Sequence, residues 1–284
     1  MRVLEFKKQF HDFLKDEFPE TEINSFFIIL IENYLGLSRL EFALNPEKKL
    51  TLDEFQKLNT AMLKLKEHEP LQYILGETEF FGLKFKVDPN TLIPRPETEE
   101  LVSWILADIE KEKTISQLHI LDIGTGSGCI AISLAKNLPK STVFALDVSS
   151  EALQIASENA RLNKVFVNFS KTDILNTETL PGNFNIIVSN PPYVRELEKA
   201  EMHRNVLENE PHLALYVSNE DPLIFYRKIT SLAKNNLTVG GHLYVEINQY
   251  LSKETEDLMK KEGFITTLKK DIFGNFRMLK GVKK

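Results

Sequence analysis

Residues 118–131 read Leu118-His119-Ile120-Leu121-Asp122-Ile123-Gly124-Thr125-Gly126-Ser127-Gly128-Cys129-Ile130-Ala131. An apolar run leads into glycines at every second position, and a helical pattern follows through Ala135. Glycine tolerates positive φ and lets a backbone approach a ligand with no Cβ in the way. In open α/β sheets, ligands bind at the carboxyl ends of strands, where the first N–H groups of the next helix also point. The stretch therefore predicts a strand, a ligand-binding turn and a helix.

The spacing of the three glycines separates this turn from other glycine-rich turns. It follows the pattern G-x-G-x-G, whereas hydride-transfer dinucleotide sites carry G-x-G-x-x-G. The third glycine comes one residue early, which argues against a nicotinamide-dependent dehydrogenase.

Acidic residues follow the next two predicted strands. The strand from Thr142 to Leu146 ends in Asp147, whose carboxylate can accept hydrogen bonds from both hydroxyls of a ribose. Asp147 could instead cap the following helix, but Ser149 already suits that role. The strand at 165–169 leads to Asp173, which is placed to meet an adenine amino group. This order of residues predicts a cofactor that contains a nucleoside.

A second motif, Asn190-Pro191-Pro192-Tyr193, follows the apolar run 184–189. Two prolines cannot continue a hydrogen-bonded ladder, so the chain leaves the sheet there in a stiff, extended conformation. This holds two acceptors together, the side-chain oxygen of Asn190 and the carbonyl of Pro191, and such a pair suits a planar NH2 group. Tyr193 offers an aromatic face to cover that group. The motif indicates chemistry on an amide or aromatic amine nitrogen, although alone it also fits a proline-terminated strand with an Asn turn.

Strands and helices alternate from Leu118 onward, which predicts a doubly wound, mostly parallel sheet. The strands are expected near 118–123, 142–147, 165–169, 184–190, 241–248, 264–268 and 275–280. The last two have no helix between them, so we expect the final strand to run antiparallel to the others.

The first 70 residues lack strand patterns and predict a helical bundle. Phe6, Phe10 and Phe13 recur at helical spacing and are expected in its core. After Gly76 the pattern changes to alternation, which predicts a β-hairpin. We therefore divide the chain into a helical bundle for substrate recognition, a β-hairpin linker and a catalytic domain, at residues 1–70, 71–93 and 94–284.

Two segments leave alternatives open. The long polar stretch from Val194 to Asp221 is either a lid or substrate-docking loop, or a solvated insertion. Arg95 and Glu97, on the proline-rich stretch before the catalytic domain, form either a structural ion pair or a contact with the substrate.

Composition narrows the classes of function. The net charge of −6 lacks the basic character of an obligate nucleic-acid binder and favours a protein substrate. The single cysteine, Cys129, excludes an internal disulfide framework, and we expect no metal site. The amino terminus lacks the apolar core of a signal peptide, and the longest apolar run, 26–31, is too short to span a bilayer. We expect a soluble, cytoplasmic protein.

These motifs together resemble a known family, the protein-(glutamine-N5) methyltransferases that modify class 1 peptide chain release factors. The resemblance covers nearly the whole chain in order, and it is carried by residues 69–76, 92–99, 122–128, 190–194, 225–227 and 245–247. The Asn-Pro-Pro-Tyr motif alone would also admit adenine-N6 methyltransferases, but its combination with Pro94-Arg95-Pro96-Glu97 is more specific. This sequence departs from the family at Asn248-Gln249, where a glycine and a later glutamine are usual.

The resemblance implies a seven-stranded, Rossmann-like class I methyltransferase domain and S-adenosylmethionine as its cofactor. The implied cofactor contacts come from the glycine turn, the two strand-end acidic residues and the start of the proline motif: Asp122, Gly124, Thr125, Gly126, Ser127, Gly128, Asp147, Asp173 and Asn190. Substrate binding is implied for residues 190–193, with Asn190, Pro191 and Tyr193 in catalytic roles.

Two other functions fit parts of the sequence. An adenine-N6 methyltransferase acting on DNA or RNA would use the same strand-end motif, but the acidic balance argues against it. A non-catalytic adaptor with a vestigial nucleotide pocket would be free to lose one of the two motifs, and both are intact here.

Overall fold

The computed structural model describes residues 1–45, 47–112 and 117–284. The chain forms two compact units. The first contains Met1–Gly76 together with His203–Asn209, and the second contains Glu77–Met202 together with Glu210–Lys284. A short segment far along the chain thus belongs to the amino-terminal unit, which the sequence did not indicate. Its helix is tied there by Asn209, whose Nδ2 donates to the carbonyl of His68 over 3.0 Å.

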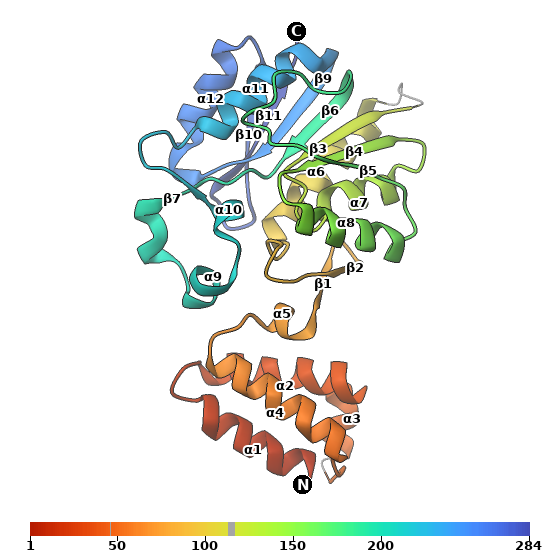
Figure 1. Cartoon of the computed structure of the whole chain (residues 1–284), viewed down its shortest axis with the longest axis vertical. Helices are drawn as coiled ribbons and strands as arrows, with labels where there is room; N and C mark the ends of the chain where they lie inside the picture. The colour runs from red at the N-terminus through yellow and green to blue at the C-terminus, as the bar shows by residue number, and fades with distance from the viewer. Residues whose placement is uncertain (46, 113–116) are drawn as a thin grey trace. The chain divides into compact units, whose positions relative to one another are not determined.

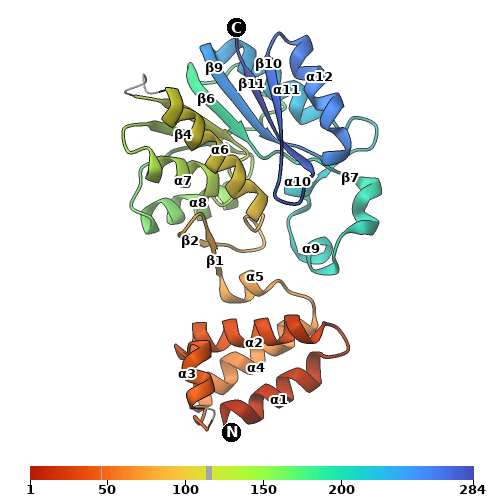
Figure 2. The same ribbon diagram turned by 180° about the vertical axis from the view of Figure 1, so that it is seen from behind.

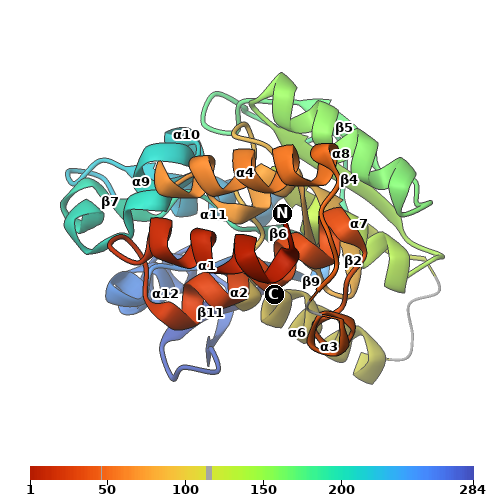
Figure 3. The same cartoon turned by 90° about the horizontal axis from the view of Figure 1, so that it is seen from below.

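The first unit is a helical bundle in which α1, α2 and α4 lie alongside one another (Figure 3). Its helices are α1 (Val3–Leu14), α2 (Glu20–Leu35), α3 (Arg39–Leu44), α4 (Leu52–Lys66), α5 (Leu71–Leu75) and α9 (Arg204–Asn209). Phe6 and Phe10 are fully buried in the core, as predicted. Phe13 is 37% exposed, so its expected place in the core is wrong; its ring instead lies under the ammonium group of Lys66.

The second unit begins with a β-hairpin formed by β1 (Glu77–Phe80) and β2 (Leu83–Lys86). Phe81 and Gly82 at its turn both have positive φ, which matches the twist of the two strands. Asn159 joins the hairpin to the next layer, because its side chain bonds both the N–H and the carbonyl of Lys86, over 2.7 and 3.0 Å. The hairpin expected after Gly76 is confirmed.

A seven-stranded sheet forms the centre of the second unit, in the order β10-β11-β9-β6-β3-β4-β5. The strands are β3 (His119–Ile123), β4 (Thr142–Asp147), β5 (Asn168–Lys171), β6 (Phe184–Ser189), β9 (Leu237–Glu246), β10 (Ile265–Lys270) and β11 (Phe276–Val282). All neighbours from β9 to β5 are parallel, and β11 is antiparallel to both of its neighbours, as predicted. The chain runs from β3 outward to β5 and then returns to β6 on the other side of β3. This reversal creates the crevice at which such sheets bind ligands.

Helices cover both faces of the sheet (Figures 1 and 2). One face packs against α6 (Pro96–Glu112), α7 (Cys129–Asn137) and α8 (Ser150–Leu162). The other packs against α11 (Ile224–Asn236) and α12 (Ser252–Lys261), with the short 3₁₀ turn η2 (Gln249–Leu251) before α12. None of the helices in the described residues has the length and apolar character needed to cross a bilayer.

Two strands start three or four residues away from the first residue predicted for them. The third was expected at 165–169, but β5 starts at Asn168 because a turn follows the end of α8: Lys164 has positive φ and the N–H of Val165 bonds back to Ala160. The fifth was expected from Gly241, but β9 starts at Leu237. Gly240 lies inside that strand, where its N–H pairs with the carbonyl of Lys283.

The long polar stretch after the proline motif is folded. It contains β7 (Val194–Arg195), the 3₁₀ helix η1 (Glu196–Glu201), α9, α10 (His212–Leu215) and β8 (Tyr216–Val217). The two short strands β7 and β8 pair in parallel, so the stretch leaves the second unit and returns to it at one place. The stretch therefore has its own secondary structure, and the choice between a lid or docking loop and a solvated insertion stays a prediction.

Candidate active site

A pocket of about 350 Å³ lies at the carboxyl ends of the parallel strands, where the chain reverses around β3. Ile123, Leu146 and Ser189, the last or next-to-last residues of β3, β4 and β6, all line it. The structure brings nine of the predicted site residues to its wall: Gly124, Thr125, Gly126, Ser127, Asp147, Asp173, Asn190, Pro191 and Pro192. Three others, Asp122, Gly128 and Tyr193, are not among the residues that line it.

The glycine turn after β3 forms one wall. Gly124 and Gly126 have φ of 74° and 54°, and a Cβ built on either would meet no atom within 4 Å. Their backbone therefore faces open space and is held from behind, since the N–H groups of Gly124 and Thr125 both donate to the carbonyl of Leu146. Gly128 has another function in the fold: a Cβ there would lie 2.8 Å from Ile132 and 3.2 Å from Ala156, so this glycine allows α7 and α8 to pack.

Asp147 ties the end of β4 to the glycine turn. Its Oδ2 accepts a hydrogen bond from the N–H of Gly126 over 2.8 Å, and its Oδ1 accepts one from the N–H of Ser149 over 2.9 Å. The helix cap belongs to Ser149, whose hydroxyl accepts from Ala152, so Asp147 is not needed for that purpose. Each carboxylate oxygen retains capacity to accept from a ligand.

Asp122 lies behind the turn, completely buried. Its Oδ2 accepts a hydrogen bond from the Thr125 hydroxyl over 2.6 Å, while its Oδ1 has no hydrogen-bond partner among the described residues. Burial raises the pKa of Asp122 to about 7, opposed in part by the Thr125 bond. Asp122 is not among the residues that line the pocket, and it supports the turn through Thr125.

Asp173 lies at the exposed rim of the pocket, beyond β5. Its carboxylate accepts from the N–H of Leu175 over 3.0 Å and from the side chain of Asn176 over 2.7 Å. These bonds fix the loop, whose apolar neighbours Ile174 and Leu175 also line the pocket. In this part of the pocket, apolar side chains therefore lie next to one carboxylate.

The proline motif forms the opposite wall. Asn190 donates from Nδ2 to the hydroxyl of Thr98 over 3.3 Å, and no described residue donates to its Oδ1. Tyr193 turns away from the pocket: its hydroxyl donates to Oε1 of Glu246 over 2.9 Å, and the Arg277 guanidinium lies 5.9 Å from its ring centroid. Tyr193 is not among the residues that line the pocket, and the aromatic cover that we expected over a flat substrate group stays a prediction.

A buried polar cluster supports this wall. Glu246, at the end of β9, is 1% exposed and accepts hydrogen bonds from Tyr193 and Thr98. Burial raises the pKa of Glu246, and burial together with the Glu246 carboxylate raises the pKa of Tyr193 well above its ordinary value. Asn248, where the sequence departs from the family pattern, donates to the carbonyl of Tyr193 over 3.0 Å and so helps to hold the motif.

Sequence reasoning did not assign Thr98, Glu246 or the α10 segment to the site. Pro211, Leu213 and Ala214 line the pocket, although they lie more than twenty residues beyond Asn190 in sequence. Thr98 lies within the Pro94–Glu99 stretch that the resemblance marked, but its isolated hydroxyl carried no signal of its own. Only the fold places these residues beside the motif.

Arg95 forms a structural ion pair, one of the two expected alternatives. Its guanidinium lies 2.5 Å from the carboxylate of Glu210, whose side chain is 1% exposed and also accepts from the N–H of Ile93. Arg95 and Pro211 both line the pocket, so this ion pair holds α10 against the site. No ion pair joins Arg95 to Glu97 in the described residues.

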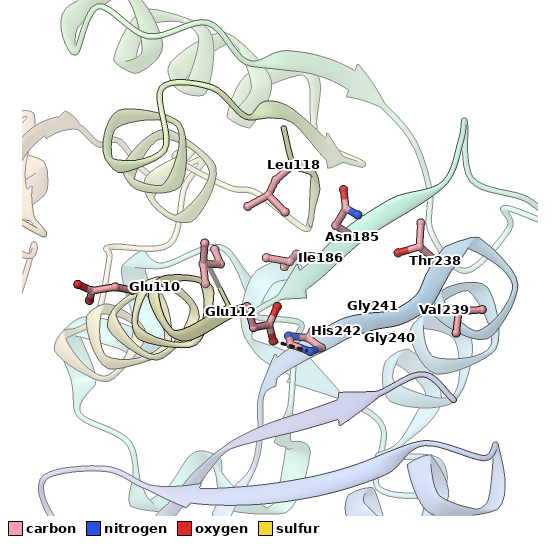
Figure 4. A pocket seen from close by; sticks show the side chains of 11 residues that line it. Glu110, Glu112, Leu118, Asn185, Ile186, Thr238, Val239, Gly240, Gly241 and His242 are labelled. Carbon is pink, nitrogen blue, oxygen red and sulfur yellow. Dashed lines mark ion pairs between the residues drawn. The ribbon is translucent and has the colours of Figure 1, made fainter. Parts of the chain in front are cut away.

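A second cavity, of about 280 Å³, lies at the opposite end of the sheet (Figure 4). It contains the His242–Glu112 ion pair, at 3.3 Å, and glycines 240 and 241. Burial lowers the pKa of His242. This cavity lies at the amino-terminal ends of the parallel strands, away from the glycine turn and the proline motif.

The first pocket fits S-adenosylmethionine. The glycine turn leaves open space beside its backbone, the Asp147 carboxylate has acceptor capacity, and the region between Val148 and Leu175 offers apolar sides for an adenine ring. When bound, this cofactor supplies a methyl group carried on a positively charged sulfur.

Comparisons with known proteins agree with this geometry. Residues 102–215 match the family described as "Methyltransferase small domain", and residues 7–76 match the "PrmC N-terminal domain". The chain is 57% identical over 281 residues to a release factor glutamine methyltransferase of Flavobacterium psychrophilum, covering 99% of each chain. It is 43% identical to the protein of that description from Bacteroides thetaiotaomicron, covering 94% of this chain and 95% of that one. A methyltransferase structure from Pyrococcus furiosus shares the fold, with a TM-score of 0.52 at 20% identity over 82% of this chain and 99% of that one.

The doubly wound sheet, the glycine turn and the strand-end proline motif define a class I, S-adenosylmethionine-dependent methyltransferase. Within that class, sequence identity over the full length decides the family, because the fold alone is shared by methyltransferases with many substrates. The chain belongs to the release factor glutamine methyltransferase family.

Proposed function

We propose that this protein transfers a methyl group from S-adenosylmethionine to the side-chain amide nitrogen, N5, of a glutamine in class 1 peptide chain release factors. The observation that carries this proposal is Oδ1 of Asn190, to which no described residue donates, in a pocket that Asn190 and Pro191 both line. Two acceptors held by a stiff chain suit the two N–H donors of a primary amide.

An amide nitrogen is a poor nucleophile, because its lone pair is delocalised into the carbonyl. The amide nitrogen gains the methyl carbon as the bond from that carbon to the cofactor sulfur breaks, and the nitrogen then releases one of its two protons to solvent. Hydrogen bonds from the NH2 group to Asn190 and Pro191 stabilise the positive charge that develops on nitrogen during this transfer. These bonds gain strength in the transition state, and loss of one should raise the barrier by about 2–4 kcal/mol. The remaining contribution of the protein is to align the reactants and exclude water.

The other residues of the motif keep the acceptors in place. Pro191 and Pro192 restrict the backbone, and Tyr193 anchors the end of the motif through its bond to Glu246. Tyr193 thus acts through the position of Asn190 and Pro191, rather than by contact with the substrate.

We assign the cofactor contacts to the remaining pocket residues. Gly124, Thr125, Gly126 and Ser127 hold the methionine part, and the carboxylate of Asp147 accepts hydrogen bonds from the ribose. Asp173 borders the adenine, and Asn190 lies near both the cofactor and the substrate. Asp122 and Gly128 contribute through the shape of the turn.

The substrate assignment rests on family membership. Family membership favours a glutamine target over an adenine target, and an enzyme over a vestigial adaptor. Residues 7–76, which match the "PrmC N-terminal domain", are the part we propose for recognition of the release factor. Release factors act during translation, so the proposed activity belongs in the cytoplasm.

The test is methyl transfer with purified components. The protein is incubated with isotope-labelled S-adenosylmethionine and either a class 1 release factor, double-stranded DNA or RNA. We expect label in the release factor, with the mass of one methylene added to a single glutamine-containing peptide. Label in nucleic acid, or on another side chain, would contradict the proposal, and the Asn190→Ala variant serves as the background control.

A further inference from the structure

The Glu246 carboxylate accepts two hydroxyl protons at the base of the proline motif. Its Oε1 lies 2.9 Å from the hydroxyl of Tyr193, and its Oε2 lies 2.7 Å from the hydroxyl of Thr98. Glu246 is 1% exposed and Thr98 2%, so solvent does not supply alternative partners. An ionised carboxylate accepts hydrogen bonds only, and both hydroxyls must therefore donate to it.

The direction of these bonds has a consequence for Asn190. The Thr98 hydroxyl has one proton, and the bond to Glu246 uses it, so Thr98 can only accept from its remaining neighbour. That neighbour is the Asn190 side chain, 3.3 Å away, and only its Nδ2 can donate. The opposite end of the amide, Oδ1, is then left for a ligand in the pocket.

We propose that Glu246 and Thr98 are positioning residues, which act as a relay to set the orientation of the Asn190 amide with Oδ1 available as an acceptor. This inference rests on the proposed methyl transfer to an amide nitrogen. The orientation matters because a flipped Asn190 would present Nδ2, a donor, to a substrate nitrogen that also carries donors. Such an arrangement removes one acceptor and adds repulsion at the reacting atom.

The relay needs the ionised form of Glu246, which two hydroxyl donors and one guanidinium favour against the effect of burial. Burial raises its pKa, and the nearby carboxylate of Glu97 acts in the same direction. The two hydroxyl donors and the Arg277 guanidinium, on β11, lower it. The site therefore contains both the donors and the cation that a buried carboxylate requires.

The relay can be tested through the Asn190 amide itself, without methyl transfer. The protein is labelled with ¹⁵N in its asparagine side chains, and the Asn190 signal is identified by its loss in Asn190→Ala. We expect Thr98→Val to shift this signal and to speed its exchange with solvent, because valine keeps the shape of threonine but cannot accept a hydrogen bond. Thr98→Ser, which keeps the hydroxyl, should restore the original signal.

Kinetics provide the second measurement. Thr98→Val should lower kcat for the release factor by about 10-fold or more, with the dissociation constant of the cofactor changed by less than about threefold. Glu246→Gln should act in the same direction, because an amide at 246 can donate to Thr98 and release the threonine proton toward Oδ1. Thr98→Ser should recover most of the turnover.

Thr230→Val is a matched control for the loss of a buried threonine hydroxyl. Thr230 is fully buried on α11, does not line the pocket, and its hydroxyl has no hydrogen-bond partner among the described residues. We expect its turnover to equal that of the wild type.

Three results would overturn the relay: an unchanged Asn190 signal in Thr98→Val, a turnover of that variant within twofold of the wild type, or equal losses in Thr98→Ser and Thr98→Val. The third result would show that Thr98 acts through packing and not through its hydroxyl. If the wild-type protein methylates no glutamine, the proposed function fails instead, and the amide signal still decides whether Thr98 orients Asn190.

Discussion

The backbone N–H of Gly126 lies 2.8 Å from Oδ2 of Asp147. One carboxylate thereby connects the turn after β3 to the end of the neighbouring strand β4, at the wall of the pocket where the cofactor is proposed to bind. Asp147 thus shapes the glycine turn in addition to presenting acceptors to the ribose. A substitution at Asp147 should affect both features together.

Asp147→Asn should weaken cofactor binding by about 10-fold or more, because the neutral amide is a weaker acceptor and one of its ends can only donate. Isothermal titration calorimetry with S-adenosylmethionine measures this loss. Asp53→Asn, at an exposed ion pair in the bundle, is the control and should bind as the wild type does. An unchanged affinity in Asp147→Asn would remove this residue from the ribose site.

Alanine at two glycines of the same turn should produce different defects. Gly126→Ala places a methyl group in the open space of the pocket, so beyond the cost of about 1 kcal/mol for alanine at φ of 54° it should mainly reduce cofactor affinity. Gly128→Ala, with φ of 83° and a neighbour at 2.8 Å, should mainly reduce the free energy of unfolding, by about 1–3 kcal/mol. Urea unfolding and calorimetry on both variants separate the two effects, and identical behaviour would show that the distinction is wrong.

Asn190→Ala should lower the rate of methyl transfer by about 100-fold or more while reducing cofactor affinity only modestly. The reason is that the lost acceptor matters most when charge develops on the substrate nitrogen. Single-turnover kinetics with saturating cofactor measure the chemical step directly. Asn236→Ala, whose side chain bonds the carbonyl of Gly182 away from the pocket, is the control; near-normal turnover in Asn190→Ala would exclude the acceptor role.

Asp122 should make stability depend on pH. Its folded-state pKa of about 7 lies above its unfolded value of 3.8, so the folded protein binds the proton more tightly than the unfolded chain does. The contribution of Asp122 to stability is therefore complete below about pH 4 and is lost as the pH rises toward 7, with a slope of up to about 1.4 kcal/mol per pH unit.

Urea unfolding between pH 5 and 8.5, without cofactor, measures this dependence in the wild type and in Asp122→Asn. The variant cannot ionise at this position but can still accept from Thr125, so the difference between the two curves isolates Asp122 from Glu246 and other buried groups. We expect the wild type to lose stability relative to the variant as the pH rises. Parallel curves would contradict a raised pKa.

Arg95→Met should destabilise the protein by about 3–5 kcal/mol, because it leaves the Glu210 carboxylate buried without its cation. A double variant with Glu210→Gln should recover much of this loss, since the charge is then removed as well. Thermal unfolding of the two single variants and the double variant gives the coupling between the two positions. Additive losses would mean that the ion pair does not stabilise the fold.

Most of the pocket was predictable because it is built from residues at strand ends. A parallel sheet places the carboxyl ends of its strands at one edge, so Gly126, Asp147 and Asn190 had to approach each other once the strands were correctly identified. Asp122 and Tyr193 were assigned to the site because they belong to its two motifs. A motif does not determine whether a side chain points into the pocket or away from it. The structure places both behind the pocket, where they support Thr125 and the proline motif.

The sequence by itself determined the succession of strands along the chain, the glycine turn and the stiff exit from β6. Through its resemblance it also determined the family. The structural features follow from local properties: hydrophobic period, glycine φ and the missing N–H of proline. Only the tertiary structure decided that Thr98 and Glu246, 148 residues apart in sequence, share a hydrogen bond beneath Asn190. Contacts of this kind depend on the register and packing of elements distant in the chain, and no local pattern encodes them.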